Sequence, residues 1–320
     1  MEYGKIPYVE KAVSRIFYGT AMPPFSTEGE GNALLDAIFA LGITAFDTAR
    51  VYGEAEKALG KWMAERGMRE RVTILTKCAH PDTDWTKRLS EKEIRADFAV
   101  SAENLQTDYI DVYLAHRDDP AVPAGDVVEI FNAMHAEGKI GAFGGSNGTH
   151  ERIAEANEYA YKHNLIPFSV SSPNFGLAEQ IRDMWGGGLG ISGPAQQAAR
   201  DWYEAEQMPV IAYFSLGRGL FSGRVKSGET EKAAAVMDSF AMKGYADPDN
   251  FERLRRCEEL ARKYDRSVPQ IALAWLFGQK LNTFAVIGTG RPERMRENLE
   301  ALAIRLTEDE LLYLDLQGRG

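Results

Sequence analysis

The sequence predicts an α/β protein that folds as a (β/α)8 TIM barrel with long loops over the C-terminal mouth. Eight short runs of β-branched or aromatic residues alternate with longer amphipathic segments, which is typical of repeated βα units around a parallel sheet. The turn after the first run reads Gly19-Thr-Ala-Met-Pro-Pro. Because it lacks the Gly-x-Gly-x-x-Gly pattern of an open, doubly wound sheet, we regard that fold as the less favoured alternative.

Each element follows from its local pattern. The predicted strands cover residues 15–18, 43–46, 72–76, 109–115, 141–145, 168–171, 210–214 and 284–287. The predicted helices have apolar residues at three- and four-residue intervals and cover residues 32–41, 55–66, 91–105, 127–137, 151–162 and 251–264. Two irregular segments, 174–194 and 221–249, are expected to lie over the mouth. The first is glycine-rich, and it is interpreted as a functional loop or lid, with simple disorder as an equal alternative.

Length and composition limit the classes of function. A chain of 320 residues with 44% hydrophobic residues suits a single barrel domain over residues 1–320. The net charge of −10 disfavours nucleic acid and membrane as partners, and no apolar run approaches the ~20 residues of a membrane span. With two cysteines and no apolar signal region at the N-terminus, we expect a cytoplasmic protein. A homo-oligomer is left open.

Four polar residues follow predicted strands, at the barrel end where catalytic groups lie. They are Asp47, Tyr52, Lys77 and His116. Taken singly, Asp47 suits a helix cap, Lys77 suits a lysine whose ammonium group reaches solvent, and His116 suits a structural histidine. The histidines and cysteines show no metal-ligand spacing, so no metal is predicted.

Together these residues suit the reduction of a carbonyl group, which needs a hydride donor and an acid. A free tyrosine, with a pKa of ~10, is a weak acid at neutral pH, and a neighbouring cation such as Lys77 would make its phenolate accessible. Asp47 would keep the lysine charged. His116 would orient the carbonyl oxygen.

Four motifs of this chain resemble the aldo-keto reductase superfamily. They are residues 42–56 (Gly-Ile-Thr-Ala-Phe-Asp through Tyr-Gly-Glu-Ala-Glu), Thr76-Lys77, residues 114–120 (Leu-Ala-His-Arg-Asp-Asp-Pro) and residues 138–147, which end in Gly-Gly-Ser-Asn. The resemblance implies a barrel without a Rossmann domain that reversibly reduces aldehydes or ketones to alcohols with NAD(P)H. It also implies that the four polar residues are the catalytic tetrad, with Tyr52 as the proton donor.

The same resemblance implies residues that bind NADPH, with NADH as the alternative because Gly288 replaces the lysine of many relatives. Ser146 and Asn147 match the pair that binds the nicotinamide carboxamide. Ser172 and Phe175 match the positions of a glutamine and a stacking aromatic residue. The remaining candidates are Ser215, Leu216, Gly217, Arg218 and Gly223 for the pyrophosphate, Thr289 and Arg294 for the 2′-phosphate, Glu297 and Asn298 for the adenine, and Thr20.

Two other functions are weighed against a reductase that acts on a small carbonyl or alcohol substrate. A Schiff-base aldolase would use Lys77 but leaves Tyr52 without a role. A regulatory subunit would bind NADPH as a redox sensor with little turnover. For the substrate, Phe25, Trp85 and Trp185 are candidate contacts. Arg117 and the two aspartates after it are interpreted as a salt-bridged loop, with contact to a polar substrate as the alternative.

Overall fold

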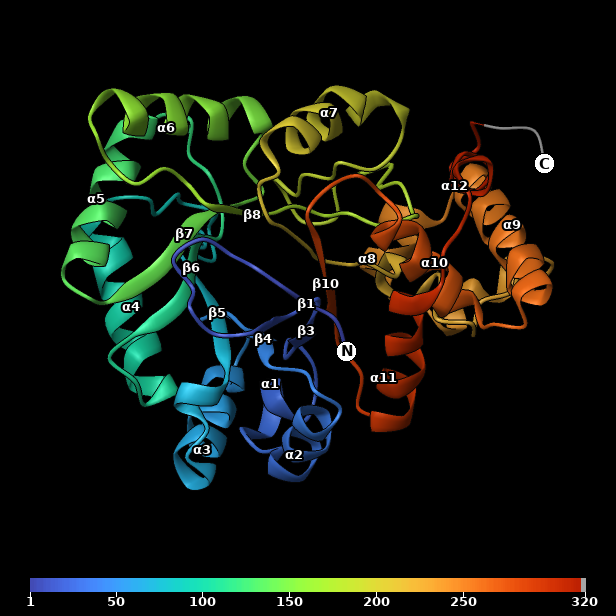
Figure 1. Cartoon of the computed structure of the whole chain (residues 1–320), viewed down its shortest axis with the longest axis horizontal. Helices are drawn as coiled ribbons and strands as arrows, with labels where there is room; N and C mark the ends of the chain where they lie inside the picture. Colours follow the sequence, from blue (N-terminus) through green and yellow to red (C-terminus); the bar gives the residue numbers. More distant parts are fainter. Residues whose placement is uncertain (318–320) are drawn as a thin grey trace.

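The computed structural model describes residues 1–317 and shows a closed barrel of eight parallel strands surrounded by helices (Figure 1). Around the barrel the strands are β3 (Ile16–Gly19), β4 (Ala45–Asp47), β5 (Thr73–Cys78), β6 (Ile110–Ala115), β7 (Ile140–Ser146), β8 (Val170–Ser172), β9 (Val210–Ala212) and β10 (Thr283–Ile287). The last strand, β10, pairs in parallel with β3 and closes the sheet. The predicted (β/α)8 barrel is therefore confirmed. Residues 318–320 of the predicted domain lie outside the described residues.

The helices that were predicted from amphipathic periodicity are present with small shifts at their ends. They are α2 (Asn32–Ala40), α3 (Ala55–Arg66), α4 (Glu91–Leu105), α5 (Ala124–Ala136), α6 (His150–Lys162) and α9 (Pro248–Tyr264). Further helices are α1 (Phe25–Glu28), α7 (Gln197–Glu206), α8 (Ser239–Tyr245), α10 (Val268–Phe277), α11 (Pro292–Leu299) and α12 (Glu308–Leu314). Short 3-10 turns cover Arg69–Arg71, Pro194–Gln196, Gly217–Gly219, Thr230–Ala235 and Glu300–Ala303.

An N-terminal hairpin fills one end of the barrel. Its antiparallel strands are β1 (Tyr3–Gly4) and β2 (Val13–Ser14). From this hairpin, Ile6 and Val13 pack with the side chains inside the barrel, such as Phe17 and Val112. Since side chains fill the barrel interior, a ligand site belongs at the opposite, C-terminal mouth.

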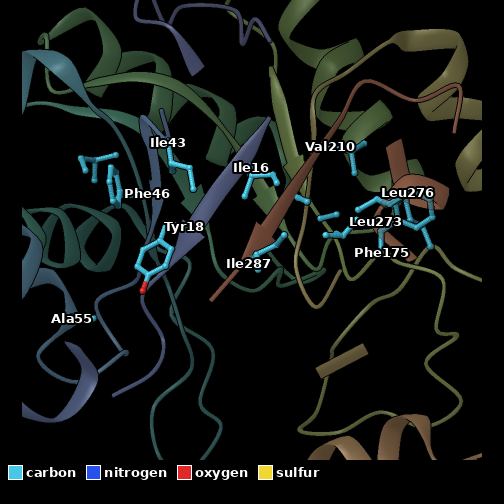
Figure 2. Close-up of a cluster of buried hydrophobic side chains, with 14 of the residues drawn as sticks. Ile16, Tyr18, Ile43, Phe46, Ala55, Phe175, Val210, Leu273, Leu276 and Ile287 are labelled. Carbon is cyan, nitrogen blue, oxygen red and sulfur yellow. The ribbon is translucent and has the colours of Figure 1, made fainter. Parts of the chain in front are cut away.

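A larger core lies between the barrel and its helices (Figure 2). Residues alternate along β3, so that Ile16 and Tyr18 join this outer core while Phe17 points into the barrel. Burying each of these side chains contributes about 1.5–3 kcal/mol. The barrel is therefore a rigid support for the groups at its mouth.

One close approach between strands requires glycine. A Cβ atom at Gly144 in β7 would lie 1.8 Å from the carbonyl oxygen of Val170 in β8, whereas one at Gly145 would meet nothing within 4 Å. We expect Gly144→Ala to lower the free energy of unfolding by about 3 kcal/mol, because neither strand can shift without disturbing the barrel. Urea denaturation measures the change, and Gly145→Ala is the matched control. Equal stability of the two variants would contradict this account of the strand contact.

Candidate active site

Three of the predicted catalytic residues meet where neighbouring strands end. Asp47 is the last residue of β4, Lys77 lies near the end of β5, and His116 directly follows β6. The Lys77 Nζ atom lies 2.6 Å from Asp47 Oδ1 and donates a second hydrogen bond to the Thr48 carbonyl oxygen at 2.9 Å. Because β4, β5 and β6 are adjacent in the barrel, their carboxyl ends hold these side chains together.

Tyr52 completes this group from the loop after β4. Its ring centroid lies 5.1 Å from Lys77 Nζ and 5.9 Å from the His116 ring, which it meets edge-on. The Tyr52 hydroxyl also interacts with the Lys77 ammonium group. The structure thus brings all four residues of the predicted tetrad to one place at the mouth.

Burial and mutual charge set the ionisation of these groups. Burial acts to lower the pKa of Lys77, but Asp47 and Tyr52 raise it by more, so the pKa lies above its ordinary value. Burial raises the pKa of Asp47, and Lys77 opposes that shift. Burial likewise raises the pKa of Tyr52, with Lys77 acting to lower it. Lys77 is therefore charged and Tyr52 carries its proton at neutral pH.

His116 is held as the neutral imidazole. Burial, followed by the charges of Lys77 and Arg117, lowers its pKa well below 6.5. Its Nδ1 atom is buried without a hydrogen-bond partner among residues 1–317. His80, which sequence reasoning did not select, lies beside it with ring centroids 4.8 Å apart. A neutral ring can donate one hydrogen bond to a carbonyl oxygen without adding a charge.

Two predicted cofactor residues, Ser146 and Asn147, lie at the end of β7. The Ser146 hydroxyl donates to the Ser172 carbonyl oxygen in β8 at 2.7 Å. The Asn147 amide group donates to the His116 carbonyl oxygen at 3.2 Å and accepts from the Leu189 amide at 3.1 Å. Contact with a cofactor amide would require Asn147 to exchange one of these partners.

Other predicted residues lie inside the same end of the barrel. Thr20 and Ser215 are fully buried, and their hydroxyls donate to the carbonyl oxygens of Asp47 and Ala212 at 3.0 and 2.9 Å. The Ser172 hydroxyl donates to the Ile211 carbonyl oxygen at 2.8 Å. These hydroxyls hold strand ends together.

The prediction for Phe175 is wrong. The resemblance implied that this ring stacks on the nicotinamide, but its side chain is 0% exposed and packs 5.7 Å from the Trp275 ring. Figure 2 shows it against Leu273 and Leu276. The reason is that α10, which the sequence did not predict, buries the ring.

Tyr213 offers an aromatic ring at the mouth instead. It directly follows β9, is partly exposed, and donates from its hydroxyl to Asn147 Oδ1 at 2.5 Å. Its position at the end of a predicted strand was the signal that could have found it. Among the candidate substrate contacts, Phe25 is buried in the core, whereas Trp85 is 48% exposed and Trp185 is partly buried.

The glycine-rich segment 174–194 folds over the mouth as an ordered loop. The Asp183 carboxylate accepts hydrogen bonds from the amides of Trp185, Gly187 and Gly188 at 3.2, 2.7 and 3.3 Å. The Trp185 ring packs 5.2 Å from Phe214, which follows β9. The interpretation of this segment as a loop over the mouth is confirmed.

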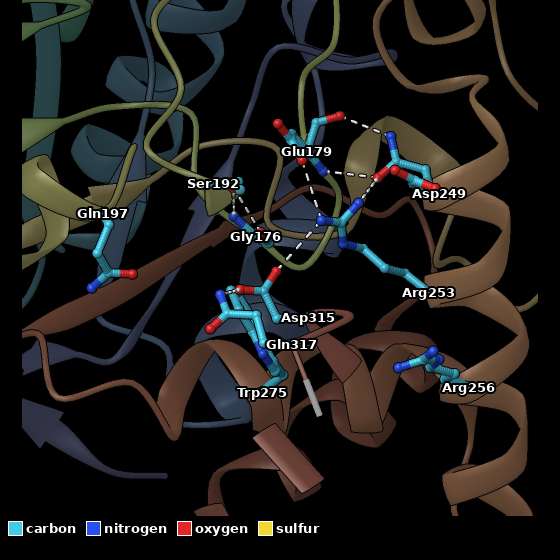
Figure 3. Close-up of polar contacts among 12 residues, drawn as sticks. Gly176, Glu179, Ser192, Gln197, Asp249, Arg253, Arg256, Trp275, Asp315 and Gln317 are labelled. Atoms are coloured by element: carbon cyan, nitrogen blue, oxygen red, sulfur yellow. Dashed lines mark hydrogen bonds and ion pairs between the residues drawn. The ribbon is translucent and has the colours of Figure 1, made fainter. Parts of the chain in front are cut away.

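The base of this loop is anchored by α9 (Figure 3). Arg253 is 2% exposed and its guanidinium lies 3.2 Å from Glu179 and 3.6 Å from Asp315. Within the loop, the Ser192 hydroxyl donates to the Gly176 carbonyl oxygen at 2.8 Å. Both ends of the loop are therefore fixed, and its central part lies over the site.

Arg218, predicted at the pyrophosphate, is engaged by other groups. Two hydrogen bonds of 3.0 and 2.8 Å join its Nε atom to the Asp238 carboxylate, and the guanidinium lies 5.4 Å from the Trp185 ring centroid. The neighbouring candidates Leu216 and Gly217 lie at the start of the turn after β9, and Gly223 follows a few residues later; both glycines have positive φ. A phosphate at Arg218 would have to replace Asp238.

The predicted phosphate and adenine residues lie in the loop before α11 and along that helix. Arg294 and Glu297 are exposed, Thr289 is partly exposed, and Asn298 is buried. The Thr289 carbonyl oxygen accepts a hydrogen bond from the Tyr18 hydroxyl at 2.7 Å, which fixes the loop after β10. Within residues 1–317 Arg294 forms no ion pair. The residues present therefore fit an anionic group at this side of the mouth.

Comparison with known proteins identifies the family. The sequence matches the model of the aldo/keto reductase family over residues 15–316. The chain belongs to this family. Members are oxidoreductases that act on carbonyl groups, and the match runs from β3 through α12.

Its relatives span nearly the same length. The aldo-keto reductase str7 of Strobilurus tenacellus is 27% identical over 92% of this chain and 82% of that protein. The uncharacterized oxidoreductase YrpG of Bacillus subtilis is 28% identical over 98% and 95% of the two chains. A putative voltage-gated potassium channel subunit beta of Schizosaccharomyces pombe is 27% identical over 91% and 84% of the two chains.

No helix within residues 1–317 has the length and apolar character of a membrane span.

Proposed function

We propose that this aldo/keto reductase reduces aldehydes or ketones with NADPH, and that Tyr52 delivers the proton. The observation that carries the proposal is the buried Lys77–Asp47 pair, 2.6 Å apart, in contact with Tyr52. A charged lysine beside a phenol stabilises the phenolate that forms when the proton leaves. We also propose a single domain, a small-molecule substrate and a cytoplasmic location.

The proposed chemistry assigns one task to each residue. Bound NADPH would supply the hydride that adds to the carbonyl carbon. As negative charge develops on the carbonyl oxygen, Tyr52 gives it a proton, and Lys77 stabilises the phenolate left behind. Neutral His116 donates a hydrogen bond that orients the same oxygen. In the reverse direction the Tyr52 phenolate takes the proton back.

The preference for NADPH is supported by the start of α11. Arg294 is exposed and has no ion-pair partner within the described part of the chain, and Thr289 lies in the loop that leads into this helix. These groups would hold the 2′-phosphate, while Ser146, Asn147 and Tyr213 would hold the nicotinamide end. NADH remains the alternative cofactor.

The two rival functions are less well supported. A Schiff-base aldolase needs a neutral lysine, whereas Asp47 and Tyr52 raise the pKa of Lys77 and keep it charged. The redox-sensing subunit has one specific observation in its favour, the potassium channel subunit beta among the relatives. The complete tetrad favours turnover over sensing alone.

The test of the proposed function follows the absorbance of NADPH, with NADH in parallel, during incubation with activated aromatic aldehydes. We expect loss of absorbance that depends on the aldehyde and is faster with NADPH. Tight binding of NADPH without turnover would favour the redox sensor. Failure to bind either nucleotide would overturn the nicotinamide proposal.

The low pKa of His116 predicts a pH profile. Because the pKa lies well below 6.5, the ring stays neutral as the pH falls through the range in which an ordinary histidine gains a proton. We therefore expect kcat/KM for aldehyde reduction to show no inflection between about pH 6 and 7. Steady-state rates measured at constant ionic strength from pH 5.5 to 8 check this. A tenfold fall centred near pH 6.5 that His116→Asn removes would show that His116 titrates normally.

A further inference from the structure

Arg117 is a buried cation without a carboxylate partner at the edge of the candidate active site. It directly follows His116 at the end of β6 and is 7% exposed. The sequence favoured a salt-bridged loop here, but Asp118 pairs with Arg152 at 3.3 Å instead. Within residues 1–317 no carboxylate lies within ion-pair distance of Arg117. The predicted loop therefore does contain a salt bridge, at Asp118, but Arg117 takes no part in it.

The partners that Arg117 does have are neutral. Its Nη1 atom donates to the His116 carbonyl oxygen at 3.4 Å, and its guanidinium interacts with the Tyr213 hydroxyl. The Nε atom is buried with no hydrogen-bond partner in the described part of the chain. A guanidinium has five N–H donors, so much of its capacity is unused in a position where an unpaired charge is costly.

Neighbouring arginines are neutralised, which sets Arg117 apart. Arg50, on the loop after β4, and Arg88, on the loop after β5, each lie 3.0 Å from the buried carboxylate of Asp97. The charge of Asp183 also acts on Arg117, but that carboxylate is not within ion-pair distance and already accepts hydrogen bonds from backbone amides. Only Arg117 of these three is left to bind an external anion.

The charge of Arg117 lies close to the side chains that are proposed to take part in the reaction. It is close enough to act on Tyr52, His116 and Tyr213, the three side chains around the proposed position of the carbonyl. It is also remote from the proposed phosphate site. In the barrel order, β6 lies across from β10, after which Thr289 and Arg294 follow. An anion at Arg117 would therefore belong to the substrate and not to the cofactor phosphates.

We propose that Arg117 binds a carboxylate of the substrate, so that the preferred substrates are aldehydes or ketones that also carry a carboxylate. The planar fork of a guanidinium offers two parallel N–H donors, which match the two oxygens of a carboxylate. This inference rests on the proposed carbonyl reduction. The reaction is unchanged by it: a hydride adds to the carbonyl carbon, Tyr52 protonates the oxygen, and the carboxylate is not altered.

The test compares substrates that differ in one charge. These are 3- and 4-carboxybenzaldehyde and their methyl esters, reduced with NADPH by the parent protein. We expect kcat/KM for at least one acid to exceed that of its ester by about 10- to 100-fold. Arg117→Met should remove this preference, because it should lower kcat/KM for the acid by at least tenfold more than kcat/KM for the ester. Arg117→Lys should keep part of the preference, since it keeps the charge without the fork.

Arg182→Met is the matched control, because Arg182 is exposed on the loop that covers the mouth and its loss changes the net charge equally. It should leave the preference for the acid intact. Inhibition by benzoate against benzamide in the parent protein gives a second measurement that does not depend on the folding of a variant. Benzoate should inhibit at least tenfold more strongly.

The outcomes separate this inference from the proposed function. If the esters are reduced but neither acid is preferred, or if Arg117→Met lowers both rates equally, the carboxylate proposal is overturned while the reductase proposal stands. Equal inhibition by benzoate and benzamide would also overturn it. If neither the acids nor the esters are reduced with NADPH or NADH, it is the proposed function that fails.

Discussion

Replacing Tyr52 with phenylalanine is expected to lower kcat for aldehyde reduction by about 10²- to 10⁴-fold, the range typical of losing a general acid. The variant keeps the ring, whose centroid lies 5.9 Å from that of His116, and removes only the hydroxyl that interacts with Lys77. Cofactor binding should therefore change little. The measurements are the rate of NADPH oxidation and the dissociation constant of NADPH from fluorescence titration.

Tyr213→Phe is the control for this experiment. This variant also removes a hydroxyl at the mouth, which donates to Asn147 at 2.5 Å. Tyr213, however, is not the proposed proton donor. Its loss should cost no more than about tenfold, as expected for one hydrogen bond in the site. If Tyr213→Phe were as inactive as Tyr52→Phe, or if Tyr52→Phe kept the parent rate, Tyr52 would not be the proton donor.

The barrel and the tetrad could be predicted because their signals are local. A parallel strand that is buried on both faces reads as a short apolar run, and a polar residue at its end stands out, as Asp47 and His116 do. Once the strands are known to be neighbours, the fold brings their ends together. The Lys77–Asp47 contact of 2.6 Å then follows from positions on β4 and β5.

What could not be predicted depends on contacts between distant segments. In α10, almost every side chain is buried, so no 3.6-residue periodicity reveals it. A capping signal was available, since the Gln270 side chain accepts a hydrogen bond from the Ser267 amide at 2.8 Å. Missing this helix led to the error at Phe175, whose ring α10 buries.

The error at Arg117 has a similar origin. The sequence places two aspartates directly after it, and local charge pairing is a reasonable expectation. In the structure Asp118 instead forms an ion pair with Arg152 on α6, which is 34 residues away in the chain. Packing between elements decides which arginine pairs with a given carboxylate. No short stretch of the sequence reveals that pairing.

Replacing Lys77 with methionine is expected to have the largest combined effect. The substitution leaves Asp47, which is 5% exposed, with a buried carboxylate and no cation. Breaking a buried ion pair in this way costs about 3–5 kcal/mol of unfolding free energy. Activity should fall by at least 10²-fold as well, because the Tyr52 phenolate loses the charge that stabilises it. Urea denaturation and NADPH oxidation measure the two effects.

The double variant Asp47→Asn with Lys77→Met separates stability from chemistry. A neutral amide beside methionine leaves no unpaired charge, so part of the lost stability should return. Activity should not return, because the cation that supports Tyr52 is still absent. Recovery of both together would mean that Lys77 acts only through folding. Recovery of stability alone would show that the buried pair is retained for the proton transfer, at a position where apolar residues could have packed instead.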